Sequence, residues 1–458
     1  MSDRADDAAG ELRSAWGEVL AALARARDAI DDPKLHAPPA SNRLVAEGYR
    51  YLFGWVHGAI ERAFHADPAR PHFRRAIQPI SRSTIDNADA LYLNAEIDGT
   101  RSFMIRGRAT REPGRKPPHY VIFEAATDYA GDSGSIAELR PGRRVGTGKL
   151  DSSELRIDGD GRFEIVLAPE RPPGFAGNFL ATKRVRTVKQ KDGSEQVVTA
   201  IARHLTLREL FHDWEHEDAL EIAIEPVEDG APPPAPLDAG RAASELRRLA
   251  TIVENQMKFW NEFYAVVLET HADMNGDGKR FMPRNDFNAP NAATLATGGG
   301  QSTNVYAGGV YELTPDEALV VTMRVPVAPL YQGFHLANLW GESLDYANHQ
   351  SSLNGFQTAW EGEGAAHSTA RSARYVIAHR DPGVANWLDT TGVAIGFMTF
   401  RWTYTEPPAE MPVVGVTKVA VGDVASALGA DAPRASADER TRTIRVRRAH
   451  VQRRYRQY

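Results

Sequence analysis

The alternation of apolar and polar positions divides the chain into helical stretches and strand-rich stretches. Apolar residues recur at helical spacing over residues 8–31 and again from about 42 to 66, which predicts two amphipathic helices. From 74 to 226 the period shortens toward two, in short runs separated by turn sequences, which indicates antiparallel strands. A third helix is predicted over 241–271, and a second strand-rich stretch over 306–406. The pattern therefore predicts helices followed by a β layer, twice in one chain.

One short motif occurs once in each strand-rich stretch. Residues Pro173–Thr182 read PGFAGNFLAT, and residues Pro382–Thr390 read PGVANWLDT. Because Asn178 and Asn386 occupy the same place in both copies, we expect them to serve the fold, and residues present in one copy are better candidates for function. The predicted fold class is α+β, with two duplicated antiparallel β-sandwich or jelly-roll-like domains, each preceded by helices, plus an N-terminal helical cap and a basic C-terminal arm.

A proline-rich stretch, EDGAPPPAPLDAG, separates the two halves of the chain. Proline fits neither a helix interior nor a central strand, so this stretch is predicted to be a linker. The predicted organisation is N-terminal helices at 1–66, a first β-rich domain at 67–227, the linker at 228–240, a long helix at 241–272, a second β-rich domain at 273–406 and the C-terminal arm at 407–458.

Composition narrows the classes of protein. The chain has no cysteine, which excludes disulfides, thiolate metal sites and cysteine nucleophiles. Its first residues lack the basic and apolar regions of a secretion signal, and no segment approaches the roughly eighteen apolar residues of a membrane-spanning helix. We therefore expect a cytoplasmic protein with no membrane partner.

The net charge of −6 is unevenly distributed along the chain. The segment Arg434–Tyr458 contains nine arginines and two acidic residues, so the remaining surface is acidic and should repel nucleic acid. We expect the arginine-rich arm to lie against the acidic body or against a partner subunit of a homo-oligomer. Nucleic acid is not the expected partner, because no recognisable nucleic-acid-binding pattern surrounds the arm.

The segment Trp340–Gln357, WGESLDYANHQSSLNGFQ, combines aromatic residues with many hydrogen-bonding side chains. Such a combination is typical of sites that hold small polar or sugar-like ligands, although a hydrogen-bonded loop that covers the β layer would have the same composition. In the first interpretation His349 acts as acid or base and Asn354 orients the substrate. The predicted substrate-binding residues are Tyr346, Asn348, Gln357, Asn386, Trp387 and Arg401.

Two other stretches resemble known ligand loops in part. Asp273, Asn275 and Asp277 have the spacing of the first calcium ligands of a calcium-binding loop, but Arg284 stands where a bidentate glutamate belongs. The stretch Gly142–Lys149 has five residues between its outer glycines where a phosphate-binding loop has four, followed by leucine instead of a hydroxyl residue. Calcium is therefore the one cofactor considered, and no nucleotide cofactor is expected.

Several segments together resemble a known group of bacterial proteins. DNADALYLNAEIDG, GNFL, LTPDEALVVT, NWLDTTG and FRW are similar to sequences of two-domain proteins that carry the domains of unknown function catalogued as 1254 and 1214. The resemblance covers roughly residues 40 to 405 and implies a β-rich, two-domain protein without implying an activity. Two hypotheses follow: an enzyme acting on a small polar or sugar-like organic substrate, or a non-catalytic ligand-binding or scaffold protein.

Overall fold

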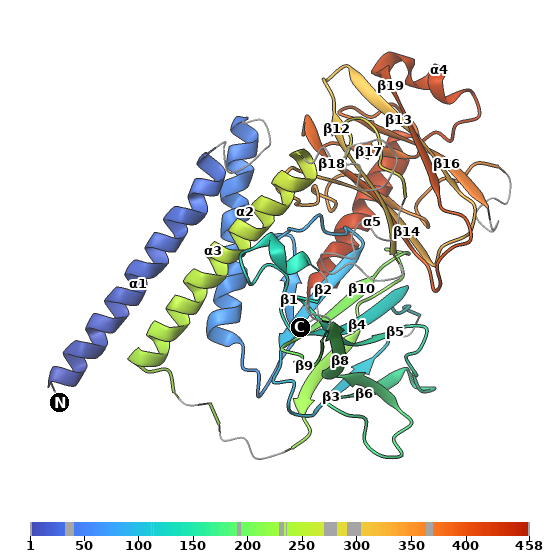
Figure 1. Cartoon of the computed structure of the whole chain (residues 1–458). Helices are drawn as coiled ribbons and strands as arrows, with labels where there is room; N and C mark the ends of the chain where they lie inside the picture. Colours follow the sequence, from blue (N-terminus) through green and yellow to red (C-terminus); the bar gives the residue numbers. More distant parts are fainter. Residues whose placement is uncertain are drawn as a thin grey trace. The chain divides into compact units, whose positions relative to one another are not determined.

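The chain folds into two compact units, and each unit draws on several segments of the sequence (Figure 1). The computed structural model describes residues 2–32, 41–110, 112, 114–140, 142–189, 194–228, 233–234, 236–269, 282–290, 304–362 and 370–456. Unit 1 comprises Met1–Ser81, Leu91–Glu209 and Ala219–Phe263, and unit 2 comprises Arg82–Ala90, Leu210–Asp218 and Tyr264–Tyr458. Two short segments from the N-terminal half of the chain therefore belong to unit 2.

Helices form one layer of unit 1. They are α1 (Ser2–Asp31), α2 (Asn42–Ile60), the π-helical turn η1 (Glu61–His65) and α3 (Ala239–Glu269), most of which belongs to this unit. The helix α2 begins where it does because the Ser41 hydroxyl accepts the amide of Leu44 at 3.1 Å. An ion pair of 2.7 Å between Arg25 and Glu254 joins α1 to α3 (Figure 1). None of the helices in the described ranges has the length and apolar character that crossing a membrane requires.

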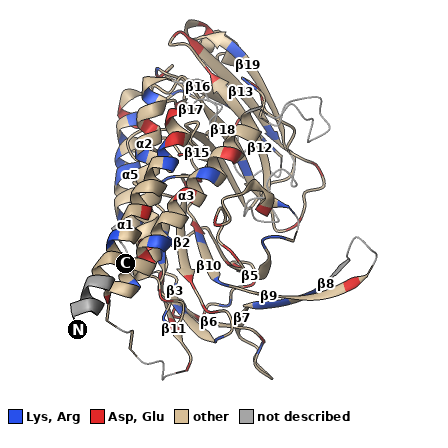
Figure 2. Ribbon diagram, turned by 60° about the vertical axis from the view of Figure 1, so that its left-hand side comes forward, with Lys and Arg blue, Asp and Glu red and all other residues tan. Residues whose placement is uncertain are grey.

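The strands of unit 1 form two sheets and a separate hairpin. The first sheet has the order β1-β2-β10-β4-β5 and the second β11-β3-β6-β7, while β8 and β9 form an antiparallel hairpin that projects from the sheets (Figure 2). Phe123 of β4 packs edge to face on Phe163 of β6, so the two sheets face each other. The bounds are β1 Arg74–Ile77, β2 Ala90–Glu96, β3 Phe103–Arg108, β4 Tyr120–Ala126, β5 Gly146–Asp151, β6 Arg162–Ala168, β7 Asn178–Ala181, β8 Lys183–Lys189, β9 Glu195–Ile201, β10 His204–Leu210 and β11 Glu221–Pro226.

Unit 2 contains two four-stranded sheets around one apolar core. The orders are β12-β18-β14-β15 and β17-β16-β13-β19, and residues such as Phe334, Tyr375 and Phe400 from both sheets form the core between them. The short helix α4 (Val424–Leu428) covers the outer face of β13 and β16, and α5 (Ala437–Arg456) follows. The bounds are β12 Asn304–Glu312, β13 Glu317–Val325, β14 Tyr331–Ala337, β15 Ser352–Asn354, β16 Arg371–Ala378, β17 Trp387–Asp389, β18 Ile395–Thr403 and β19 Val413–Ala420.

The strand orders show that one architecture occurs twice. The sequence β2-β10-β4-β5 in unit 1 corresponds to β12-β18-β14-β15 in unit 2, and β11-β3-β6-β7 corresponds to β19-β13-β16-β17. Most strand pairs are antiparallel, but β6–β7 and β16–β17 are both parallel, so even the exception is repeated. The predicted α+β class, with two similar antiparallel β-rich halves, is confirmed.

The repeated asparagine makes the same three hydrogen bonds in each unit. The Asn178 side chain accepts from the amide of Arg156 and donates to the carbonyls of Arg156 and Glu164. In the same way Asn386 accepts from the amide of Ala359 and donates to the carbonyls of Ala359 and Arg374. Each asparagine thus ties a loop to the neighbouring strand, and Asn386, a predicted substrate-binding residue, is occupied by the fold.

Candidate functional site

A pocket of about 1450 Å³ opens in unit 1. Its walls come from the loop after η1, the loop after β2, the loop after β4, the turn between β9 and β10, and one side of α3. Pockets that enclose one drug-sized molecule usually measure about 300–1,000 Å³, so this volume suffices for a small ligand with its bound water. Because every wall belongs to unit 1, the pocket is complete within that unit.

A network of ion pairs forms one wall of the pocket. The guanidinium of Arg62, which is buried, donates to Glu96 at 3.0 Å and to both carboxylate oxygens of Asp132 at 2.8 Å. Arg248 of α3 also pairs with Glu96. Burial opposes the charge on Glu96, but the charges of Arg62 and Arg248 outweigh it and lower the pKa of Glu96. The network therefore joins two guanidinium groups to two carboxylates in one set of ion pairs.

His204 stands beside this network as a neutral imidazole. Burial, followed by the positive charge of Arg62, lowers the pKa of His204 to about 3. Its Nε2 lies 3.8 Å from the Asp132 carboxylate, and its ring lies 5.9 Å from that of Tyr129. A group with this pKa does not exchange protons near neutral pH, so His204 can shape the pocket and form hydrogen bonds but is a poor acid or base there.

The loop that carries Asp132 is fixed to α3 by the local sequence. Asn255 donates to the carbonyl of Asp132 at 2.7 Å, and Gln256 donates to its carboxylate at 3.0 Å. Gly131 has φ of +91°, and a Cβ there would lie 2.5 Å from the Gln256 amide oxygen, so only glycine fits. Ser133, in a GDSGS stretch like that of some serine proteases, donates to Glu138 at 2.6 Å and forms part of this turn.

Two arginines of the pocket retain unused hydrogen-bond donors. Arg144 donates through Nε to the carbonyl of Asp128 at 2.8 Å, and within the described residues its terminal nitrogens have no partner. The side chain of Arg143 is exposed and likewise has no side-chain partner in the described ranges. Burial lowers the pKa of Arg144, because its charge is partly removed from water. Both arginines come from the Gly142–Lys149 stretch, which resembles a phosphate loop only in part.

The residues predicted from the sequence lie in unit 2, where several share a buried cluster. Asn354 is fully buried and donates to the Asp89 carboxylate at 3.0 Å, and its own amide donates to the Gln357 side chain. Tyr346 is buried with its hydroxyl 3.1 Å from that of Tyr455, and Arg401 is buried and donates to the carbonyl of Ile85. Four of the predicted residues are therefore held by contacts internal to the unit.

The other predicted residues lie nearer the surface of unit 2. His349 contacts Asp389 at 2.7 Å, with 42% of its side chain exposed. Asn348 donates to Asp345 and accepts from Arg448. The indole of Trp387 donates to the carbonyl of Ala378, and the guanidinium of Arg440 lies over its ring. His349 and Asn354, proposed as catalytic partners, thus bond to different carboxylates.

Asp89 is the central residue that sequence reasoning missed. It is fully buried and accepts hydrogen bonds from Trp214 at 2.9 Å, Tyr331 at 2.6 Å and Asn354. Burial raises the pKa of Asp89, whereas the hydrogen bonds and the charges of Arg447 and Arg454 act in the opposite direction. The one sign of Asp89 in the sequence is its place directly before an apolar strand. An aspartate in an exposed turn before a strand has the same pattern, so the sequence alone does not identify it as buried.

The predicted calcium ligands Asp273, Asn275 and Asp277 lie outside the described residues. Arg284, at the twelfth position of that loop, is described and forms an ion pair with Glu312 at 2.5 Å. Across the described ranges, no three histidine, aspartate or glutamate side chains are grouped closely enough to hold a metal ion.

Comparison with known proteins supports the fold and leaves the activity open. The sequence matches no protein-family model and no curated protein. A putative uncharacterized protein from Burkholderia cenocepacia has a similar solved structure, with a TM-score of 0.71 and 26% identity over 91% of this chain and 100% of that one. The VPA0106 protein from Vibrio parahaemolyticus also matches, with a TM-score of 0.38 and 12% identity over 86% of this chain and 100% of that one. The architecture is therefore shared with an uncharacterised protein.

Proposed function

We propose that this protein binds a small polar molecule with an anionic group, such as a carboxylate or phosphate, in the unit 1 pocket. The observation that carries the proposal is the pair Arg143 and Arg144, whose guanidinium groups line a pocket of about 1450 Å³ with donors that the described residues leave unused. A planar guanidinium recognises an anionic group through paired hydrogen bonds. The resemblance to the two-domain proteins with domains 1254 and 1214 is compatible with this proposal.

The carboxylates that line the pocket are compatible with an anionic ligand, because most of them already have a hydrogen-bonding or ion-pair partner in the protein. Glu96 and Asp132 are paired with Arg62, and Asp128 is paired with Arg203. Glu138 accepts from the amide of Gly131 and the hydroxyl of Ser133, and so it too is occupied. A cation entering the pocket would have to compete with these fixed pairs, whereas an anion meets guanidinium groups whose donors are still available.

The protonation states favour binding over acid–base catalysis in this pocket. The pKa of His204 is about 3 and that of Glu96 is lowered, so neither group changes its charge near neutral pH. Ligand binding, the second of the two sequence-based hypotheses, is therefore the function that the pocket supports best. The enzymatic hypothesis places His349 as acid or base and Asn354 as the orienting residue in unit 2. The contact of His349 with Asp389 is the feature of the structure that would favour it, because a carboxylate there can orient the imidazole.

Native mass spectrometry of the purified protein tests the proposal directly. We expect a bound small molecule with at least one anionic group, and we expect Arg144→Ala to lose it or to weaken its binding about tenfold to hundredfold, the cost of one charge-assisted hydrogen bond. If nothing co-purifies, a thermal-shift series with mono- and dicarboxylates and phosphate esters replaces the first measurement.

Arg380→Ala is the matched control, because Arg380 forms an exposed surface ion pair with Asp316 in unit 2. This variant should keep the ligand with unchanged affinity. Equal affinity of wild type and Arg144→Ala for the bound molecule would show that the pocket does not recognise its ligand through this arginine. Loss of binding in His349→Ala with retention in Arg144→Ala would favour the enzymatic site in unit 2.

A further inference from the structure

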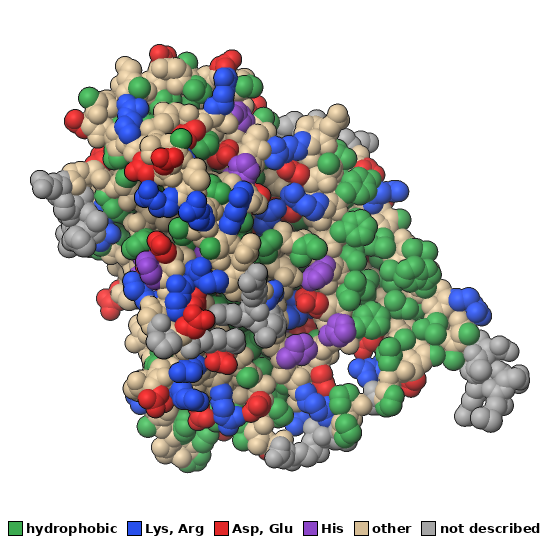
Figure 3. Space-filling view, turned by 180° about the vertical axis from the view of Figure 1, so that it is seen from behind, with side chains coloured by type: hydrophobic (Ala, Val, Ile, Leu, Met, Phe, Trp, Pro, Cys, Tyr) green, Lys and Arg blue, Asp and Glu red, His purple; other side chains and the backbone are tan. Residues whose placement is uncertain are grey.

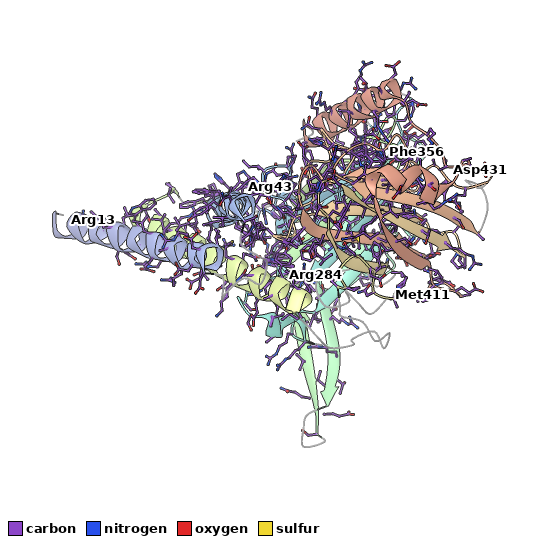
Figure 4. The ribbon with its side chains drawn as sticks, turned by 90° about the horizontal axis from the view of Figure 1, so that it is seen from above. Arg13, Arg43, Arg284, Phe356, Met411 and Asp431 are labelled. Carbon is purple, nitrogen blue, oxygen red and sulfur yellow. The ribbon has the colours of Figure 1, made fainter. Side chains whose placement is uncertain are left out.

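The helices α1 and α2 expose an apolar face to solvent. Five large apolar side chains on these two helices are between 37% and 65% exposed: Trp16, Leu20, Tyr49, Phe53 and Ile60. The helices pack as an antiparallel pair, with Arg43 at the start of α2 beside the end of α1 opposite to Arg13 (Figure 4). A bond of 3.0 Å between Tyr49 and Asp31 fixes this arrangement.

Uncharged residues make up most of this face, with the exposed arginines Arg13, Arg27 and Arg50 lying among or beside them. On α2 the exposed positions Asn42, Ala46, Tyr49, Phe53 and Ile60 share one side of the helix and are all uncharged. On α1 the exposed positions Trp16, Gly17, Leu20, Ala21 and Ala24 are also uncharged, and Glu18 is directed to Arg247 of α3. A helix face that stays in water is normally polar along its length, whereas large apolar side chains predominate here. Apolar side chains gather into one patch on this side of unit 1 (Figure 3).

The face is as large as the largest apolar patches that monomeric proteins expose. With roughly 200 Å² for a large side chain, the five exposed residues present about 500 Å² of apolar surface. Monomeric proteins rarely expose larger contiguous apolar patches than about this size. A stable dimer buries roughly 800 Å² on each partner, so these five residues would supply the apolar centre of such an interface.

We propose that this face binds the same face of a second copy of the chain, with α2 packed antiparallel to its counterpart about a two-fold axis at Phe53. The spacing of α2 is self-complementary in that arrangement. Counting outward from Phe53, small Ala46 falls opposite large Ile60, and Tyr49 falls opposite His57. Arg43 is paired with Glu47 on its own helix, and the exposed Arg50 falls opposite the apolar Val56 in this arrangement.

Analytical ultracentrifugation tests the dimer in solution. We expect the wild type to sediment as a dimer at micromolar concentration, and Phe53→Asp to raise the dimer dissociation constant at least hundredfold. Phe53 is 65% exposed, so the substitution should leave the unit folded, which circular dichroism checks. Phe356→Asp is the control, because Phe356 of unit 2 is 59% exposed (Figure 4) and lies outside the face; it should not change the dissociation constant.

Cross-linking tests the two-fold axis, and the absence of native cysteine makes it unambiguous. Mild oxidation with diamide should link Phe53→Cys into a dimer, and should link Ala46→Cys to Ile60→Cys only when the two variants are mixed. Phe356→Cys should stay unlinked. A wild-type monomer at micromolar concentration, or a dimer that survives Phe53→Asp, would overturn the proposal. Binding of the face to lipid vesicles by a monomeric protein would also overturn it.

Discussion

Replacing the repeated asparagine with alanine in each unit tests whether the motif serves the fold. Asn178 and Asn386 are both buried, and each bridges a loop amide, the carbonyl of the same residue and a carbonyl of the adjacent strand. Alanine removes all three bonds at once and leaves the backbone groups without a partner. Because the two environments are equivalent, the two substitutions should have the same cost.

The magnitude follows from the bonds that are lost. The three distances are 2.8, 2.9 and 3.0 Å at Asn178, and 2.8, 2.8 and 3.0 Å at Asn386. A typical hydrogen bond contributes about 1 kcal/mol net, so we expect each variant to lose about 3 kcal/mol of unfolding free energy. For a unit of this size that corresponds to a decrease in Tm of about 6–12 °C.

Calorimetry and urea unfolding measure this loss, with Asn348→Ala as the control. Asn348 bonds through its side chain to Asp345 in an exposed setting, so its removal should cost less than about 1 kcal/mol. A loss below about 1 kcal/mol in Asn178→Ala or Asn386→Ala would refute the structural role. Unchanged stability combined with loss of ligand only in Asn386→Ala would restore this asparagine as a substrate-binding residue.

Two further predictions concern pH and metal. The pKa of His204 falls from 6.5 to about 3 on folding, so the unfolded chain takes up a proton that the folded chain does not, and stability is lost as the pH falls from about 6.5 toward 3. Between pH 6.5 and 5 the wild type should lose up to about 1.4 kcal/mol more per pH unit than His204→Gln, measured by urea unfolding; parallel curves would contradict this. Arg284, which is paired with Glu312, stands at the position where a calcium loop needs a glutamate. We therefore expect EDTA to leave the Tm unchanged and elemental analysis to find no calcium. A decrease in Tm that calcium reverses would establish the site at Asp273.

The architecture could be predicted because local sequence patterns determine it. Strand periodicity and the repeated Pro-Gly and Asn-aromatic-Leu motif are visible without knowledge of contacts, and they predicted two similar β-rich halves. The equal roles of Asn178 and Asn386 also followed from the comparison of the two copies. Gly174 and Gly383 explain why the motif begins as it does, since both adopt positive φ, of +72° and +75°, which favours glycine.

The candidate pocket could not be predicted because its residues come together only through the tertiary fold. Arg62, Glu96, Asp132 and His204 lie on separate elements, and none forms a motif with its sequence neighbours. Polar residue density near Trp340–Gln357 suggested a site instead. There, Asn354 is buried against Asp89, a residue far away in sequence, and composition cannot distinguish a buried polar side chain from one that faces a ligand.

The interleaving of the two units limits how the gene could be rearranged. Unit 2 is completed by Arg82–Ala90 and Leu210–Asp218, which interrupt the segments of unit 1. Within it, Asp89 bonds to Tyr331 and Arg454 bonds to the carbonyl of Ala88. Recombination within α3 would produce a chain that contains the β-sandwich of unit 2 but lacks these two segments. The side chains of that sandwich that donate hydrogen bonds to them, such as Tyr331 and Arg454, would then be buried without a partner. The two β-rich halves therefore cannot be separated by such recombination, and we expect them to be inherited only as a pair.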